Sequence, residues 1–340
     1  MQTIHDFTQL GACLRAYVGG GLSWPALDAA KASSEAENEW FTPTQIDAAI
    51  EAIATEWLQQ ERLEAWLASY PQPIDRPQER VAVVMAGNIP LVGFHDYLAV
   101  LASGRSLDVK LSSKDSYLLP VLHTQLCEIN PQWAARLRFC ENVPSAPRAL
   151  IATGGDQTAA YFAREFKNIP HIVRGSRVSV AVLPPHPTAA QLEGLHQDIF
   201  LYFGLGCRSV SSLFLPQGME PQQVLLPPPQ AWVRVEAATH RGFQNAYRRQ
   251  KALLSMQGED FVDGGFFILQ ASEEWHPPMA TVYYRHYQSV EELASLLEQE
   301  APRLQSVVAE AAMFKNCVNF GLAQRPQLWD YADGIDTMTL

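Results

Sequence analysis

Short apolar runs alternate with segments of helical periodicity through the middle of the chain, and this alternation constrains the fold most strongly. The run at 81–85 is continuously apolar, as expected for a strand buried on both faces. Further strands are predicted at 107–111, 149–152 and 178–183, with helices at 91–103, 115–129, 156–166 and 188–203. Strands that alternate with helices indicate βαβ units, so we expect a parallel, Rossmann-like sheet.

The two ends of the chain have different patterns. Residues 1–70 read as helical, with Thr42 as an N-cap, Pro43 at the first helical position and Gln45 closing a capping box. Prolines at 71, 73 and 77 predict a linker. Beyond about 205 we expect a second, smaller α/β domain. Its strands are predicted at 213–215, 266–269 and 279–284, its helices at 242–256 and 289–299, and a surface loop at Pro227 to Pro229.

Charge and cysteine usage exclude several classes of protein. The net charge is −11, so the chain is a poor candidate for binding nucleic acid or anionic membranes. No apolar stretch approaches the ~20 residues of a membrane helix, and the first residues lack the features of a signal peptide. Five widely spaced cysteines, without a C-x-x-C, argue against a disulfide framework and a structural zinc site. We therefore expect a cytoplasmic protein.

Three strand-to-helix turns carry residues suited to a phosphate ligand: 86–90 with Gly87 and Asn88, 110–113 with Lys110, and 153–156 with two glycines. Ligands of open parallel sheets bind at the carboxyl ends of strands, where such turns gather. Glycines allow close approach of the backbone, and helix N-termini offer N–H groups. No G-x-G-x-x-G is present in these turns. The three turns together nevertheless favour a nucleotide site.

The segment around Cys207 is the sharpest local feature. Gly204 and Gly206 precede the cysteine at the expected domain boundary. A nucleophilic thiol needs exposure and nearby N–H groups, which such a turn can provide. The alternative is that Gly204 ends a helix and Cys207 is a buried small residue. The local residues do not decide between the two.

Five segments together resemble the aldehyde dehydrogenase superfamily, and specifically its LuxC-type fatty acyl-CoA reductase branch. They are MAGNIPL at 85–91, DVKLSS at 108–113, IATGG at 151–155, GLGCRS at 204–209 and LWDYADGIDTM at 328–338. The resemblance covers about 80 to 340. After the N-terminal helical segment (1–76) that the pattern predicts, it implies a Rossmann-like NAD(P)-binding domain (77–204) and a catalytic cysteine domain (205–310). A tail (311–340) would return to the cofactor domain or form a dimer interface.

The resemblance also implies roles for single residues. Cys207 falls on the catalytic cysteine, and Asn88 on the asparagine whose amide joins the oxyanion hole. The cofactor positions begin with Lys110 at the adenosine ribose, followed by Ser112 and Ser113 in the same turn. Thr153, Gly154 and Gly155 fall beside the pyrophosphate. Glu273 or Glu274, with Glu274 preferred, matches the glutamate of the nicotinamide ribose.

Two departures from the superfamily pattern are informative. Hydrolytic members carry a glutamate base where this chain has 171–176 without a carboxylate, which fits transfer of an acyl group to or from a thiol. His171 lies in that place and is a candidate catalytic residue. The second departure is Ser113 followed by Lys114, where NAD-preferring relatives often have a glutamate. This favours NADPH over NADH, although Lys114 also fits a solvated surface lysine.

The resulting expectation is reduction of a fatty acyl-CoA or acyl-protein thioester to the aldehyde by a homodimer. One alternative is a CoA-acylating aldehyde dehydrogenase acting on a shorter aldehyde, and another is a non-catalytic interaction subunit. Among the nine histidines, His95 could face the site. His123 and Cys127 lie one helical turn apart, but a third metal ligand is not apparent, so we expect no metal.

Overall fold

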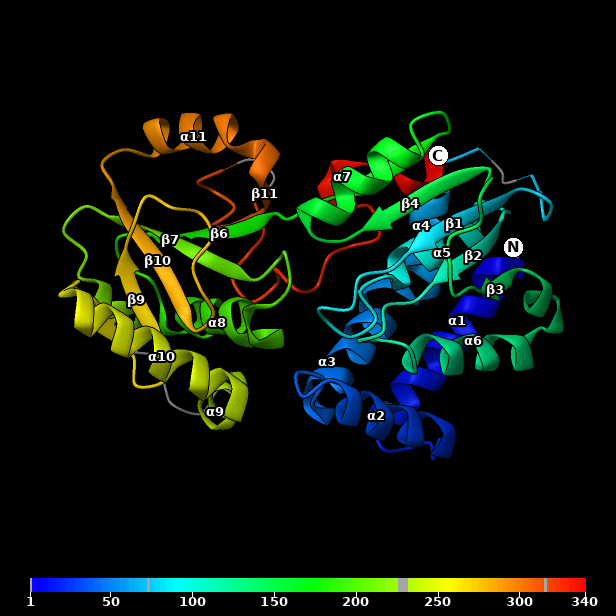
Figure 1. Cartoon of the computed structure of the whole chain (residues 1–340), viewed down its shortest axis with the longest axis horizontal. Coiled ribbons are helices and arrows are strands. Elements are labelled where there is room, and N and C mark those ends of the chain that lie inside the picture. Colours follow the sequence, from blue (N-terminus) through cyan, green and yellow to red (C-terminus); the bar gives the residue numbers. More distant parts are fainter. Residues whose placement is uncertain (1, 72–73, 226–231, 315–316) are drawn as a thin grey trace. The chain divides into compact units, whose positions relative to one another are not determined.

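Two parallel sheets, each in its own structural unit, organise the computed structural model, which describes residues 2–71, 74–225, 232–314 and 317–340. Unit 1 comprises 1–176 and 326–340, and unit 2 comprises 177–325 (Figure 1). Pro73 and Pro227 to Pro229, where the sequence predicts a linker and a loop, lie outside the described residues. None of the helices in the described ranges combines the length and apolar character needed to span a bilayer.

The sheet of unit 1 has the strand order β3-β2-β1-β4-β5, and every neighbouring pair is parallel. This is the Rossmann order, so the prediction of a Rossmann-like sheet is confirmed. The two edge strands were not predicted, because they are short and carry polar residues. The strands are β1 (Arg80–Val84), β2 (Ser106–Lys110), β3 (Leu137–Phe139), β4 (Ala149–Thr153) and β5 (His171–Arg174).

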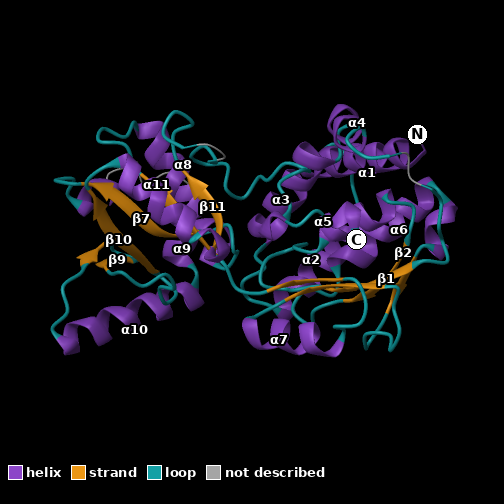
Figure 2. Ribbon diagram, turned by 90° about the horizontal axis from the view of Figure 1, so that it is seen from above, coloured by secondary structure: helices purple, strands orange, loops and turns teal. Residues whose placement is uncertain are grey.

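Helices cover both faces of this sheet, as the unbroken apolar run of β1 requires (Figure 2). Val81 and Val83 pack into the large core formed with the N-terminal helices, whereas Ala82 and Val84 face Phe162 of α7 (Asp156–Glu165). The helices of the large core are α1 (Gln2–Val18), α2 (Pro25–Glu37), α3 (Pro43–Ala52), the π-helix η1 (Ile53–Trp57), α4 (Gln60–Leu67), α5 (Phe94–Ala102) and α6 (Leu118–Ile129), followed by the 3₁₀ helix η2 (Pro131–Ala135).

The N-terminal helical segment is therefore part of unit 1 and shares its core. Thr42 caps α3 as predicted, because its Oγ1 accepts a hydrogen bond of 3.3 Å from the Gln45 N–H. Phe7 of α1 lies edge-on to Tyr97 of α5, with ring centroids 6.1 Å apart. The N-terminal helices thus contribute to the stability of the five-stranded sheet.

Unit 2 contains a six-stranded sheet of order β11-β6-β7-β10-β9-β8, parallel except for the β8–β9 pair. Helix α11 packs on one face through Leu293 and Leu297. The elements are β6 (Val178–Val182), α8 (Ala189–Phe200), η3 (Leu201–Gly204), β7 (Val210–Pro216), η4 (Pro221–Leu225), α9 (Trp232–Thr239), α10 (Arg241–Gln257), β8 (Val262–Asp263), β9 (Ile268–Ala271), β10 (Thr281–Tyr287), α11 (Val290–Gln299), η5 (Ala301–Arg303) and β11 (Leu304–Val308).

The boundary between the units lies at 176/177 and not near 204, so the predicted extents of the two domains need correction. Strand β6 and helix α8 belong to the second sheet, where β6 pairs with β7 and β11. An apolar parallel strand looks the same in either sheet, so the sequence pattern did not reveal which sheet β6 joins. The predicted tail also divides: 311–325 belongs to unit 2 and 326–340 to unit 1.

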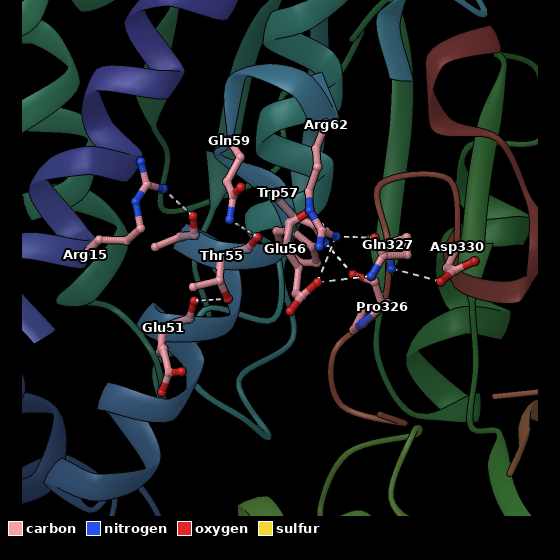
Figure 3. A network of polar contacts seen from close by, with 11 residues as sticks. Arg15, Glu51, Thr55, Glu56, Trp57, Gln59, Arg62, Pro326, Gln327 and Asp330 are labelled. Carbon is pink, nitrogen blue, oxygen red and sulfur yellow. Dashed lines mark hydrogen bonds and ion pairs between the residues drawn. The ribbon is translucent and has the colours of Figure 1, made fainter. Parts of the chain in front are cut away.

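The final segment, which carries η6 (Ala332–Gly334) and η7 (Thr337–Thr339), is held on the N-terminal helices. Figure 3 shows its start against the π-helix: Trp57 Nε1 donates to Pro326 O over 2.7 Å, and Gln327 Nε2 to Glu56 over 3.0 Å. Further along, the Tyr331 hydroxyl accepts a hydrogen bond of 2.6 Å from Trp66 Nε1. These contacts fix the tail in unit 1.

Candidate functional site

The carboxyl edge of the five-stranded sheet gathers the three predicted turns. Val84 at the end of β1 is in register with Lys110 of β2 and Ala152 of β4. Thr153 is in register with Arg174 at the end of β5. The strand order reverses between β1 and β4, and ligands of doubly wound sheets bind beside such a switch point. The turns carrying Asn88 and Thr153 flank it.

The turn of Asn88 is packed directly against the turn that follows β2. A Cβ on Gly87 would lie 2.4 Å from Ser112 Oγ, so only glycine fits there. Asp115 Oδ2 accepts a hydrogen bond of 2.8 Å from the Leu91 N–H, and burial raises the pKa of Asp115 to about 6. Asn88 itself is exposed. The two turns therefore form one fixed unit from which the Asn88 side chain projects.

The residues after β2 are open to a ligand to different degrees. Lys110 and Ser112 are half-buried, whereas Ser113 and Lys114 are exposed. Ser112 Oγ accepts a hydrogen bond of 3.2 Å from the Lys114 N–H, which closes the turn. The described geometry is compatible with their predicted part in a cofactor site, which stays a prediction.

The turn after β4 is the predicted pyrophosphate site. Gly155 is the N-cap of α7 and makes no side-chain cap, and a Cβ added to it would meet no described atom within 4 Å. A helix N-terminus attracts anions, although the first turn of α7 also carries the carboxylate of Asp156, whose Oδ1 accepts the Ser176 N–H over 2.8 Å. Thr153 and Gly154 are half-buried beside it. The role of these three residues toward the cofactor phosphates stays a prediction.

A buried ion pair that sequence reasoning missed supports this turn. Arg174 Nη1 lies 2.7 Å from Asp96 Oδ2, and Arg174 Nη2 donates to Thr337 Oγ1 over 3.2 Å. The carbonyl oxygen of Arg174 accepts the Gly154 N–H over 3.2 Å. The tail thus stabilises the turn through Arg174. The only signal in the sequence is an arginine that follows the apolar pair Ile172-Val173.

His171 is not brought to the carboxyl edge. It begins β5 in register with Leu150, whereas the carboxyl end of the strand is Arg174. The His171 Nδ1 lies 2.9 Å from the carbonyl oxygen of Ile169. Within unit 1 the structure therefore separates His171 from the turns of Asn88 and Thr153.

The Cys207 turn lies in unit 2, directly before β7. Cys207 is exposed, which contradicts the alternative of a buried cysteine. It is the second residue of a turn closed by a 3.0 Å hydrogen bond from the Ser209 N–H to the carbonyl oxygen of Gly206. Tyr202 and Phe203, both buried, have φ of 55°. Bulky residues avoid this left-handed region, so the segment before the cysteine is a strained reversal.

Glu274 lies in the loop after β9. It is exposed, and its N–H donates to Ser272 Oγ over 3.1 Å. Burial, and to a smaller extent the charge of Glu274, raise the pKa of Tyr283 on β10. This loop follows the carboxyl end of β9, whereas the Cys207 turn follows the helix η3 and precedes β7. The role of Glu274 toward a nicotinamide ribose stays a prediction.

The other two histidines noted in the sequence, His123 and His95, make contacts within unit 1. The ring of His123 lies 2.9 Å from the Tyr97 hydroxyl and 3.5 Å from Cys127 Sγ, and burial lowers its pKa to about 4. His95 Nε2 lies 2.9 Å from the carbonyl oxygen of Leu328, so it contacts the tail. The described part of the chain contains no group of three or more potential metal ligands.

Comparison with known proteins gives a family match and a set of structural neighbours. The model of the family described as LuxC acyl-CoA reductase matches residues 26–225. No curated protein sequence matches the chain significantly.

Solved aldehyde dehydrogenases share the fold at low sequence identity. An NAD-dependent enzyme from Sinorhizobium meliloti has a TM-score of 0.63 at 10% identity, over 94% of this chain and 73% of the other. An acetylating enzyme from Geobacillus thermoglucosidasius has a TM-score of 0.61 at 10% identity, over 96% and 85%. An NAD⁺ complex from Bacillus cereus has a TM-score of 0.59 at 13% identity, over 91% and 71%. The expected aldehyde dehydrogenase-like fold is confirmed.

Proposed function

Because this chain belongs to the LuxC acyl-CoA reductase family, we propose that it reduces a fatty acyl thioester to the aldehyde with NADPH. The observation that carries the proposal is the exposed Cys207 on a strained, hydrogen-bonded turn. Acyl-CoA or an acyl-protein would supply the acyl group. An exposed thiol on such a turn can attack a thioester and hold the acyl group covalently.

The chain's own residues would act as follows. The Cys207 thiolate attacks the thioester carbonyl, the carbon–sulfur bond to the donor breaks, and the donor thiolate leaves and takes up a proton. Asn88 donates its amide N–H to the oxyanion of the tetrahedral intermediate. A bound nicotinamide supplies the hydride that reduces the Cys207 thioester. The alkoxide formed at the acyl carbon would then re-form the carbonyl, which breaks the carbon–sulfur bond to Cys207 and releases the aldehyde and the Cys207 thiolate.

The cofactor would be held at the carboxyl edge of the sheet of unit 1. Lys110, with Ser112 and Ser113, is proposed to bind the adenosine ribose, and the turn at 153–155 the pyrophosphate. Glu274 is proposed to bind the nicotinamide ribose. NADPH is preferred in the proposal because Ser113 brings no carboxylate against a 2′-phosphate and Lys114 adds a positive charge.

The missing carboxylate base supports reduction and thiol transfer over hydrolysis. Segment 171–176 contains no Asp or Glu to activate a water molecule against the thioester.

His171 remains the proposed substitute in this segment. Its position at the amino end of β5 does not favour that role, so His171→Ala tests it: loss of turnover supports a role and full turnover removes it.

The experiment that tests the proposal is oxidation of NADPH that depends on added acyl-CoA, measured across acyl chain lengths. Activity with long chains that disappears in Cys207→Ala and persists in Cys140→Ala supports it. Cys140 is a matched control, because it is a half-buried cysteine outside the proposed site. Oxidation of a short aldehyde in the presence of CoA, without reduction of long acyl-CoA, would favour an acylating dehydrogenase instead, the activity named for the Geobacillus neighbour. Absence of nicotinamide binding by titration would favour a non-catalytic subunit.

A further inference from the structure

A buried serine holds the carbonyl group of Cys207. Ser179 on β6 is fully buried, and its Oγ donates to the carbonyl oxygen of Cys207 over 2.8 Å. Ser306 on the neighbouring strand β11 places its Oγ 2.7 Å from Ser179 Oγ. A serine hydroxyl has one proton. Since Ser179 gives its proton to Cys207, Ser306 is the donor to Ser179.

The other side of the turn is held by Gln324. Its Nε2 donates to Ser209 Oγ over 2.8 Å, and both side chains are buried. Ser209 in turn donates its N–H to the carbonyl oxygen of Gly206. The peptide plane before Cys207 is thus fixed through Gly206, and the plane after it through the bond from Ser179. Fixing both planes fixes φ and ψ of Cys207, and therefore the direction of its Cα–Cβ bond.

Gln324 follows a segment, residues 320–323, that is fixed against α8. Asp198 of α8 is buried and accepts the N–H groups of Gly321 and Ala323 over 2.7 and 2.9 Å. A Cβ on Gly194 would lie 2.7 Å from the carbonyl carbon of Phe320, so α8 and this segment are in close backbone contact. The position of Gln324 is therefore set by the body of unit 2.

Buried hydroxyl and amide groups are costly unless they are hydrogen-bonded, and the side chains of Ser179, Ser306, Ser209 and Gln324 all are. Ser212 on β7 shows the contrast: it is equally buried, and its Oγ has no hydrogen-bond partner among the described residues. A buried serine in this sheet therefore does not by itself indicate a role. The hydroxyl groups of Ser179 and Ser306 differ from that of Ser212, because they form a hydrogen-bonded chain that ends at the carbonyl oxygen of Cys207.

We propose that Ser179, Ser306, Ser209 and Gln324, together the Cys207 bracket, are positioning residues that aim the Cys207 side chain for acyl transfer. This inference rests on the proposed function, because it presupposes that Cys207 accepts the acyl group. If the Cys207 side chain pointed in another direction, the protein would still bind the substrate and the thiol would still be accessible to solvent. The bracket should therefore affect the rate of acyl transfer and leave substrate binding and general thiol access unchanged.

The test compares Ser179→Ala and Gln324→Ala with Ser212→Ala, which makes the same truncation at a serine outside the bracket. We expect the rate of acyl-enzyme formation from a long-chain acyl-CoA to fall by about 10- to 100-fold in the two bracket variants. KM and the alkylation rate with iodoacetamide should stay within about twofold of wild type. Ser212→Ala should match wild type in every measurement. Thermal unfolding establishes which variants are folded, and one folded bracket variant is sufficient for the test.

The outcomes separate this inference from the proposed function. Acyl-enzyme formation at wild-type rate in both folded bracket variants, or an equal loss in Ser212→Ala, would overturn the bracket and leave the proposed function standing. If wild type forms no acyl-enzyme, the proposed function fails. Hydrogen exchange of a peptide covering 204–210 then decides whether the bracket fixes the turn. Faster exchange in Ser179→Ala than in Ser212→Ala supports it, and equal exchange overturns it.

Discussion

Asp115 accepts the Leu91 N–H over 2.8 Å and so ties the turn of Asn88 to the turn that follows β2. Leu91 has a φ of 56°, a left-handed conformation that leucine rarely adopts. Both residues are buried, so water does not replace the bond. The strained conformation beside Asn88 is therefore maintained by a carboxylate from the neighbouring turn.

Replacing Asp115 with Ala should destabilise the protein by about 1–3 kcal/mol, because the buried Leu91 N–H loses its acceptor. Asp115→Asn retains an acceptor oxygen and should lose less. Urea unfolding at constant pH measures both. Equal stability of Asp115→Ala and wild type would mean that the bond contributes nothing to the turn.

The buried Asp198 should make stability depend on pH. Burial raises its pKa to about 7, against ~3.9 in an unfolded chain. A raised acid pKa stabilises the fold at low pH, and this contribution is lost as the pH rises from about 4 through about 7. The free energy of unfolding of wild type should therefore fall over this range relative to that of Asp198→Asn. Parallel curves for the two proteins would show that Asp198 does not titrate in this way.

Asn88→Ala should lower turnover by roughly 10²–10³, the usual loss for one oxyanion donor. Substrate affinity should change much less, since the oxyanion develops only in the transition state. Steady-state kinetics with a saturating acyl-CoA give both quantities. A raised KM with normal turnover would remove Asn88 from the oxyanion hole.

Ser113→Glu should weaken NADPH binding about tenfold to several-hundredfold, because like charges within a few ångströms cost on the order of 1–4 kcal/mol at a protein surface. NADH should be affected little, since its ribose hydroxyl can donate to the new carboxylate. Fluorescence titration with both cofactors measures the ratio. Preference of wild type for NADH, or an unchanged ratio in the variant, would show that Ser113 does not face the 2′ position.

The sequence was a reliable guide where a strand is buried on both faces. The runs that became β1, β2, β4 and β6 are buried at nearly every position, and each was predicted to within two residues. The edge strands β3 and β5 were missed because they are only three and four residues long and only partly buried, so they leave no continuous apolar run in the sequence. The sheet to which β6 belongs depends on its partners β7 and β11, which local periodicity does not encode.

The parts of the candidate site that could be predicted are the turns with recognisable sequence motifs. The turns of Asn88, Lys110 and Thr153 were expected at one sheet edge because they follow parallel strands. Asp115 and Gln324 were not foreseen, since each acts through a backbone or side-chain partner that only the tertiary structure brings near. In the sequence, each is a single polar residue that cannot be distinguished from an ordinary surface residue.

The account depends most on a covalent acyl group at Cys207, and mass spectrometry of the intact protein tests this directly. Incubation with a long-chain acyl-CoA in the absence of NADPH should add one acyl mass, mapped to the peptide containing Cys207 and lost when NADPH is added. Cys207→Ala should gain no acyl mass, whereas Cys140→Ala should behave like wild type. An acyl mass on Cys207→Ala, or on a peptide other than that of Cys207 in wild type, would contradict the account.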